Sequence, residues 1–244
     1  VDYAREQDVQ CNIYLEDWSS GMLNSSDYVY HMLDTLCQLD LWRVMLPDTL
    51  GILAPWQVNK FIEGLVIRYP DLNFDFHGHD DYGMATANSL AAIQAGATCV
   101  HCTVNGMGER AGNTALDEVV VGIHDFTSVK TRVDETKLIA ASERVEVFSG
   151  RRVPFNKPIV GPNVFTQTAG IHADGDHKGD LYASKLSPER FARRRRYALG
   201  KLSGKRSLEF NLSDLGIELD DEQSRIVLQR IKELADSKQT ITQD

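Results

Sequence analysis

Short apolar segments alternate with longer amphipathic segments over the first half of the chain. The apolar segments are typical of buried strands, and the amphipathic ones, with apolar residues three and four positions apart, are typical of helices. Strands are predicted over 11–17, 43–49, 73–79 and 99–106, and the helices that follow them over 25–39, 55–69, 83–97 and 114–126. The strands begin about thirty residues apart, which is the length of a βαβ unit. The pattern therefore predicts an α/β fold with a parallel sheet.

The alternation ends after a further helix predicted over 134–150. Residues 151–182 are rich in proline and glycine and predict a linker, and 183–244 predict small mixed subdomains, mainly helical, that close with a helix over 220–237. Residues 1–150 supply about four of the eight βα units of a closed barrel, so they form either half a barrel or a smaller open sheet. The start at Val1, without a methionine, favours a fragment.

The composition indicates a soluble globular protein. Of the 244 residues, 42% are hydrophobic and 25% are charged, and no apolar run approaches the roughly 18 residues of a membrane-spanning helix. The first residues lack the layout of a signal peptide, so we expect a cytoplasmic protein without a membrane partner. The net charge of −9 argues against nucleic acid as a partner, because nucleic-acid binding needs a basic surface.

The four cysteines are too few and too scattered for a disulfide framework, so reduced thiols are expected. Cys99 and Cys102 form a C-x-x-C, but residues three apart on a strand point to opposite faces. We therefore expect these two thiols to pack in the interior rather than to share a metal.

Two histidines mark the end of the third predicted strand. His77 and His79 lie on one side of that strand, and Phe74 and Phe76 lie on the other. In an α/β barrel the phenylalanines would pack against the helices, and the histidines would lie at the carboxyl end, where active sites are found. Two imidazoles on one side of a strand can ligate one divalent ion. The spacing alone leaves open whether they are metal ligands or hydrogen-bonded residues where a strand ends.

Polar residues end the other predicted strands as well. Glu16 lies near the end of the first strand, where it can act as an acid or base, and Asp48 and Thr49 end the second. Asn105, Glu109, Arg110 and Asn113 follow the fourth strand, although Asn113 and Thr114 can also be caps of the next helix. Because four strand ends coincide at one edge of a parallel sheet, a catalytic face is the better explanation.

Three motifs resemble those of a known enzyme family. The segments "HGHDDYGMATANSLAAIQAGA", "NGMGERAGNTALDEVV" and "GIHADG" resemble the 2-isopropylmalate, homocitrate and citramalate synthases, whose catalytic domain is a metal-dependent TIM barrel. The resemblance extends over nearly the whole chain, and "NIYLEDWSSG" and "LPDTLGIL" are most similar to the bacterial (R)-citramalate synthases. It implies that the chain holds the C-terminal half of a TIM barrel.

The resemblance also implies a metal site. His77 and His79 match the two histidine ligands of the family, and Asn113 matches an asparagine that accompanies them. The bound ion is expected to be Mn²⁺, Mg²⁺ or Zn²⁺. The family's aspartate ligand belongs to an R-D-G motif on the first barrel strand, and this chain has no such motif. The chain is therefore expected to be an incomplete enzyme.

The reaction implied is the condensation of acetyl-CoA with a 2-oxo acid, followed by thioester hydrolysis and release of CoA. By resemblance, Glu16 is the first candidate for acid and base work. His172 of "GIHADG" is expected to reach the active site of the partner subunit in a homodimer, with Tyr182 orienting it. Asp174, in the same motif, is assigned to acetyl-CoA binding.

The substrate is expected to be pyruvate, which gives (R)-citramalate for isoleucine biosynthesis. Thr49 would bind the carboxylate of the 2-oxo acid, and the bulk of Tyr14 would narrow the pocket. The alternative is 2-oxoisovalerate, which gives 2-isopropylmalate for leucine biosynthesis. A larger apolar group changes discrimination by only about 1–3 kcal/mol per methylene, so Tyr14 is a modest guide.

Two further hypotheses remain open at the level of the sequence. One is a related lyase such as hydroxymethylglutaryl-CoA lyase, but that enzyme has a catalytic cysteine in a glycine-rich loop where this chain has "NGMGERAGN". The other is an inactive half-barrel that serves as a binding module. The basic run at 189–207 predicts either a solvated helix over 190–196 or a cationic surface near the CoA phosphates or the subunit interface.

Overall fold

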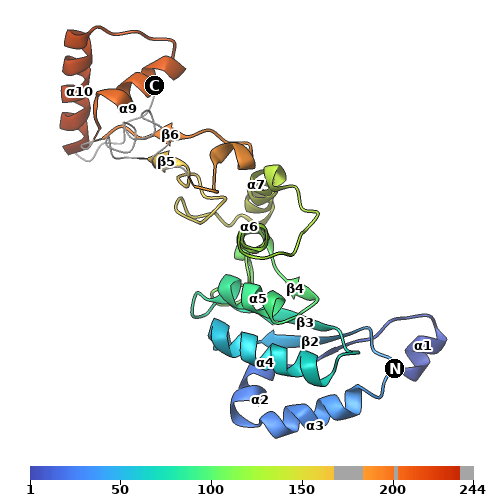
Figure 1. The fold of residues 1–244 in the computed structure, drawn as a ribbon. Coiled ribbons are helices and arrows are strands. Elements are labelled where there is room, and N and C mark those ends of the chain that lie inside the picture. Colours follow the sequence, from blue (N-terminus) through green and yellow to red (C-terminus); the bar gives the residue numbers. More distant parts are fainter. Residues whose placement is uncertain (168–183, 201–202, 237–244) are drawn as a thin grey trace. The chain divides into compact units, whose positions relative to one another are not determined.

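The computed structural model in Figure 1 describes residues 1–167, 184–200 and 203–236. The chain forms two compact units, of which the first comprises Val1–Glu135 and Ala141–Gly150 and the second comprises Thr136–Ala140 and Arg151–Asp244. Within the described ranges, no helix combines the length and the apolar character needed to cross a membrane.

A parallel four-stranded sheet forms the centre of the first unit. Its strands pair in chain order, β1-β2-β3-β4, and every pairing is parallel. The strands are β1 (Asn12–Tyr14), β2 (Arg43–Asp48), β3 (Phe74–Gly78) and β4 (Cys99–His101). The helices that follow them are α3 (Ser26–Leu36), α4 (Pro55–Arg68), α5 (Ala85–Gln94) and α6 (Leu116–Phe126). This order confirms the predicted α/β class, with half of the eight βα units of a TIM barrel.

The strands at the two ends of this sheet are shorter than the sequence pattern predicts. β1 and β4 each have three residues and each pairs with a single neighbour among the described strands. After β4 the chain turns into a short 3₁₀ helix, Val104–Gly106, within the segment that was predicted to be strand.

Two helices before α3 were not predicted. They are α1 (Asp2–Glu6) and α2 (Trp18–Asn24). In α2 the side chains of Trp18 and Met22, four positions apart, are 2% and 6% exposed, so they form one buried helical face. The spacing of four residues between these two apolar side chains was the sequence pattern that could have predicted α2.

The hydrophobic core lies between the sheet and its helices. Phe74 and Phe76 of β3 are 1% and 0% exposed and belong to one cluster with buried residues of β2, α2, α3, α4 and α5. Burying a side chain of this size contributes about 1.5–3 kcal/mol. The predicted placement of the two phenylalanines against the helices is therefore confirmed.

Aspartates hold the turns that lead from strands into helices. The buried carboxylate of Asp48 accepts hydrogen bonds from the backbone N–H groups of Ile52 and Leu53, at 3.0 and 3.1 Å. Asp80 likewise accepts one from Ala85, the first residue of α5, at 2.8 Å. Asp48 is thus a structural residue at the end of β2 rather than a free group at the catalytic edge.

The possible cap residues before α6 have other roles. No side-chain hydrogen bond caps α6, whose N-cap residue is Ala115. The Thr114 hydroxyl lies 2.8 Å from the Ser89 hydroxyl, and the Asn113 amide donates to the Met107 carbonyl oxygen. The alternative reading of these two residues as helix caps is therefore wrong, because each is drawn to a partner in a neighbouring segment.

The second unit contains small elements. They are β5 (Thr166–Gln167) and β6 (Arg196–Tyr197), which pair in parallel, the 3₁₀ helix Pro188–Phe191, α9 (Lys205–Asp214) and α10 (Asp221–Asp236). The remaining helix, α7 (Leu138–Ser149), follows the 3₁₀ turn Glu135–Lys137 and contributes residues to both units. Helix α10 matches the helix predicted over 220–237, whereas α9 was not predicted.

The helix predicted over 190–196 is wrong. The 3₁₀ helix ends at Phe191, Ala192 adopts a left-handed conformation with φ of 54°, and Arg196 already belongs to β6. The Arg193 side chain reaches back to the Gly161 carbonyl oxygen at 3.3 Å. The charge pattern of this segment could not show that the helix is absent. Its backbone and side chains instead contact residues some thirty positions earlier in the chain, in place of helical hydrogen bonds.

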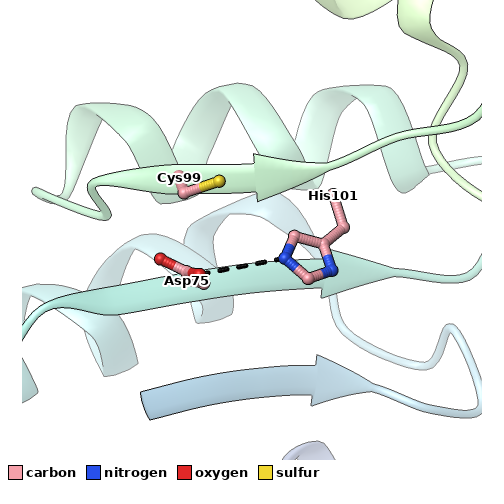
Figure 2. A group of neighbouring side chains, drawn as sticks. All are labelled: Asp75, Cys99 and His101. Atoms are coloured by element: carbon pink, nitrogen blue, oxygen red, sulfur yellow. Dashed lines mark ion pairs between the residues drawn. The ribbon is translucent and has the colours of Figure 1, made fainter. Parts of the chain in front are cut away.

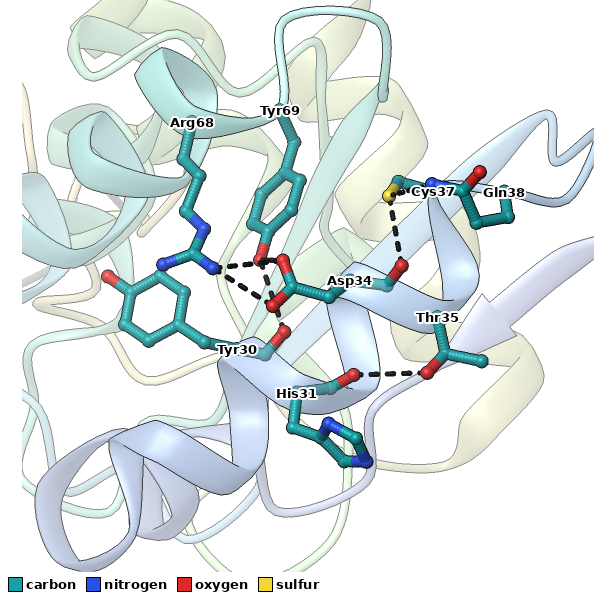
Figure 3. A network of polar contacts seen from close by, with 8 residues as sticks. All are labelled: Tyr30, His31, Asp34, Thr35, Cys37, Gln38, Arg68 and Tyr69. Carbon is teal, nitrogen blue, oxygen red and sulfur yellow. Dashed lines mark hydrogen bonds and ion pairs between the residues drawn. The ribbon is translucent and has the colours of Figure 1, made fainter.

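A polar network joins α3 to the end of α4, as Figure 3 shows. The Asp34 carboxylate accepts hydrogen bonds from Arg68 at 2.9 and 3.0 Å and from the Tyr69 hydroxyl at 2.7 Å. The Arg68 guanidinium also lies over the Tyr30 ring, 4.8 Å from its centroid. The hydrogen bonds from Tyr69 and Arg68 lower the pKa of Asp34, and burial together with the bond to Asp34 raises the pKa of Tyr69 to about 12.

We expect Tyr69→Phe to lower the free energy of unfolding by about 1 kcal/mol at neutral pH, because the hydroxyl that donates to Asp34 and to the Tyr30 carbonyl oxygen is lost. The folded state holds the Tyr69 proton more tightly than the unfolded state, in which the pKa is about 10. The contribution is therefore complete below about pH 10 and is lost as the pH rises towards about 12. We would measure the free energy of unfolding by urea titration, followed by circular dichroism, between pH 7 and about pH 12. As the pH rises, this free energy should fall less steeply in Tyr69→Phe than in the wild type. Tyr3→Phe is the matched control, since Tyr3 is 76% exposed; an equal alkaline slope in all three proteins would contradict the assignment.

Candidate metal and active site at the carboxyl edge of the sheet

His77 and His79 come together where β3 ends. Their Nε2 atoms are 3.3 Å apart, and their rings are nearly perpendicular, with an interplanar angle of 77°. Burial is the main cause that lowers the pKa of His77, and the neighbouring His79 and His101 lower it further. His77 is therefore neutral at neutral pH, which is the state in which an imidazole nitrogen can bind a metal.

The donor atoms around this pair fit a divalent cation. Two nitrogens that ligate one ion at about 2.1 Å lie about 3.4 Å apart when the angle at the ion is near tetrahedral, close to the observed 3.3 Å. Asn113 pairs with His79 through a backbone bridge, and its amide nitrogen donates to Met107 at 3.0 Å. This leaves the Asn113 Oδ1 atom buried with no hydrogen-bond partner among the described residues. A pair of imidazole nitrogens and an amide oxygen on the residue that pairs with His79 are a donor set suited to an ion that accepts nitrogen and oxygen ligands.

No described carboxylate completes a three-ligand group with the two histidines. Within residues 1–167, 184–200 and 203–236, the only group of three His, Cys, Asp or Glu side chains with ligand atoms close together is Asp75, Cys99 and His101. The aspartate ligand expected from an R-D-G motif has no counterpart in the sequence.

Glu16 and Thr49 meet across the ends of β1 and β2. The Thr49 hydroxyl donates a hydrogen bond to Glu16 Oε1 at 2.8 Å and accepts one from the Asp17 backbone N–H at 3.0 Å. The Glu16 side chain is exposed, and its charge is close enough to raise the pKa of His77, against the effect of burial. The geometry therefore brings a carboxylate, a hydroxyl and the histidine pair to one edge of the sheet.

Arg110 links the loops that follow three strands. Its guanidinium binds both oxygens of Asp81, at 2.7 and 2.9 Å, and also donates to the Thr49 carbonyl oxygen at 2.6 Å. This ion pair lowers the pKa of Asp81 and raises that of Arg110. A forked guanidinium that holds a carboxylate at two points fixes orientation as well as distance. The pattern of strand ends placed Arg110 at the edge but did not reveal this clamp.

Gly51 lets the β2 loop approach His79 closely. It has a φ of 60°, and a Cβ at this position would lie 2.8 Å from the His79 carbonyl oxygen and 2.9 Å from the Asp81 nitrogen. A side chain there would push apart the two loops that carry Thr49 and His79.

Tyr14 and His101 lie on the same face of the sheet as His77. The His101 ring is edge-on to the ring of His77, with centroids 5.8 Å apart, and Tyr14 lies 6.5 Å from His101. Tyr14 is 52% exposed. The sequence pattern did not single out His101, which is opposite His77 in the register of β3 and β4 and therefore shares its face.

Three predicted site residues cannot be placed. His172, Asp174 and Tyr182 lie outside the described residues.

Comparison with known proteins places the chain in a family. The HMGL-like family model matches residues 1–145, and the model described as Homocitrate synthase post-HMGL domain-like matches residues 159–239. All of the chain aligns at 40% identity with 47% of a Methanopyrus kandleri protein named as an (R)-citramalate synthase. All of it also aligns at 36% identity with 62% of a 2-isopropylmalate synthase from Sulfurisphaera tokodaii.

Among solved structures, an HMG-CoA lyase from Bacillus subtilis matches with a TM-score of 0.55 and 26% identity, over 63% of this chain and 54% of the lyase chain. The chain spans about half the length of the Methanopyrus relative and 62% of the Sulfurisphaera relative. The family assignment thus rests on matches over both compact units, and the chain belongs to the HMGL-like family, as the resemblance to 2-isopropylmalate, homocitrate and citramalate synthases predicted.

Proposed function

We propose that the chain carries half of the active site of a synthase that condenses acetyl-CoA with a 2-oxo acid and releases CoA. The observation that carries this proposal is the pair of His77 and His79 Nε2 atoms, 3.3 Å apart, together with the buried amide oxygen of Asn113, the backbone partner of His79, which has no hydrogen-bond partner among the described residues. These three residues would hold Mn²⁺, Mg²⁺ or Zn²⁺. The names of the relatives, which include citramalate and 2-isopropylmalate synthases, support the same reaction class.

The bound cation would polarise the keto group of the 2-oxo acid and stabilise negative charge on its oxygen. Glu16 is exposed at the same edge and can accept a proton from the methyl group of acetyl-CoA, which generates the attacking enolate. The hydrogen bond from Thr49, at 2.8 Å, orients the Glu16 carboxylate for this role. When a 2-oxo acid binds, the Thr49 hydroxyl can instead donate to the substrate carboxylate, which leaves Glu16 free to take the proton.

Arg110 supports this arrangement without contacting the reacting atoms. By holding the Thr49 carbonyl oxygen and both Asp81 oxygens, it fixes the loop that presents the Thr49 hydroxyl relative to the loop that follows His79. Positioning of this kind accounts for a large part of the rate advantage in two-substrate reactions.

The remaining parts of the site are proposed from the family resemblance. His172 would reach the active site of the partner subunit in a homodimer, Tyr182 would orient it, and Asp174 would contact acetyl-CoA. The cytoplasm is the proposed location of this enzyme.

Pyruvate is the proposed 2-oxo acid. Tyr14 shares a face with His77 and projects a half-exposed ring towards the space in front of the sheet, which leaves less room for a branched substrate. The alternative substrate is 2-oxoisovalerate, since relatives of both kinds match the chain to a similar degree.

Replacing His77 with alanine should weaken Mn²⁺ binding at least about tenfold, because one of two paired nitrogen ligands is lost. The electron paramagnetic resonance signal of free Mn²⁺ measures this in the purified 244-residue chain. His31→Ala is the matched control, since His31 is exposed on α3. Full Mn²⁺ affinity in His77→Ala would reject the ligand assignment.

The substrate is tested in the full-length protein with Mn²⁺, by detecting free CoA with a thiol reagent. The kcat/KM should be higher with pyruvate than with 2-oxoisovalerate. Tyr14→Ala should shift the ratio towards 2-oxoisovalerate by roughly 5- to 150-fold, which corresponds to about 1–3 kcal/mol. A higher kcat/KM of the wild type with 2-oxoisovalerate would replace the citramalate proposal with 2-isopropylmalate synthesis, and no CoA release with either acid would reject the synthase proposal.

A further inference from the structure

A second group of ligand-type side chains lies on the same face of the sheet as His77. In the register of β3 and β4, Asp75 is opposite Cys99 and His77 is opposite His101. Because residues two apart on a strand share a face, all four side chains lie on the side of the sheet away from the helical core. A carboxylate oxygen of Asp75, the sulfur of Cys99 and a nitrogen of His101 lie within 4.8 Å of one another. Figure 2 shows these three side chains on the neighbouring strands β3 and β4.

The Asp75 carboxylate is held so that one of its oxygens remains available. Its side chain is 2% exposed, and Arg43 donates to Oδ1 at 2.6 Å while also donating to the Thr98 hydroxyl at 3.1 Å. The other oxygen, Oδ2, is 3.8 Å from His101 Nε2. That distance is too long for a hydrogen bond. It is slightly longer than the separation of about 3.4 Å between two ligands of one tetrahedral ion at about 2.1 Å.

We propose that Asp75, Cys99 and His101 form a second divalent-cation site, separate from the His77–His79 site, that takes a thiophilic ion such as Zn²⁺ or Co²⁺. The donor set decides the kind of ion, because thiolate and imidazole favour Zn²⁺ and Co²⁺ over Mg²⁺, Mn²⁺ and Ca²⁺. Arg43 serves as the outer partner that orients the ligating carboxylate.

The charges at this site are compatible with binding. When the ion binds, the S–H bond of Cys99 breaks, the sulfur ligates the metal, and the proton goes to solvent. The thiolate and the Asp75 carboxylate then offset two of the three positive charges of the cation and Arg43. The His101 side chain is 35% exposed, so solvent reaches the site and screens the remaining charge. Burial and the charge of Asp75 raise the pKa of the Cys99 thiol, so the affinity for the ion should increase with pH.

Cys102 provides a matched control for Cys99. It is also partly buried and its thiol pKa is also raised, but it lies beyond the end of β4 and is absent from the group of ligand atoms. If cobalt binds through Cys99, substitution of Cys99 must remove the thiolate–cobalt bond and substitution of Cys102 must leave it in place, although the two cysteines belong to one C-x-x-C sequence.

The experiment is a Co²⁺ titration of the purified chain, followed by the charge-transfer absorption that a thiolate–cobalt bond produces. The wild type and Cys102→Ser should develop this absorption, and Cys99→Ser should not. His101→Ala should weaken Co²⁺ binding at least about tenfold. Circular dichroism shows whether each variant is folded.

His77→Ala should keep the absorption, because His77 belongs to the other site. The failure of the proposed Mn²⁺ site therefore leaves this result unchanged, and the two proposals are tested separately. The second site is rejected if the folded wild type develops no charge-transfer absorption. It is also rejected if Cys99→Ser keeps the absorption or if Cys102→Ser loses it.

Discussion

The alternation of side chains along β3 is the constraint on which the rest of the first unit depends. This strand is paired with β2 on one side and β4 on the other, so its backbone is held in one register. Phe74 and Phe76 are then buried against the helices, and Asp75 and His77 face the opposite way. A slip of one residue would remove both phenylalanines from the core, at a cost of about 1.5–3 kcal/mol for each. Core packing therefore determines where the chemically active side chains point.

The loops at the carboxyl edge of the sheet hold one another in position. The carboxyl ends of parallel strands meet at one edge, so short loops from different strands become neighbours. Arg110 joins three of them through Asp81 and the Thr49 carbonyl oxygen, and Gly51 allows the close approach to His79. The pairing of Glu16 with Thr49 and the position of the two histidines are thus parts of one connected arrangement. A substitution of Arg110 would therefore change both the Glu16–Thr49 pair and the position of the two histidines.

The face opposite the core carries two donor sets of different chemistry. One set has two imidazoles and an amide oxygen, whereas the other has a carboxylate, a thiol and an imidazole. Hard and borderline ions suit the first set, and thiophilic ions suit the second. His77 and His101 are opposite each other in the register of β3 and β4, and their rings connect the two sets.

The sequence by itself determined the α/β class, the order of the main strands and helices, and the opposite faces of His77 and the two phenylalanines of β3. These follow from local periodicity, because a side chain two residues along a strand returns to the same side whatever surrounds it. The resemblance of the motifs added the family and the expected metal ligands. Only the tertiary structure decided that Thr49 binds Glu16, that Arg110 clamps three loops, and that Asp75 meets Cys99 and His101. It also replaced the helix expected over 190–196 with a turn and a short strand. Each of these depends on strand register or on contacts between residues far apart in the chain, which no local pattern encodes.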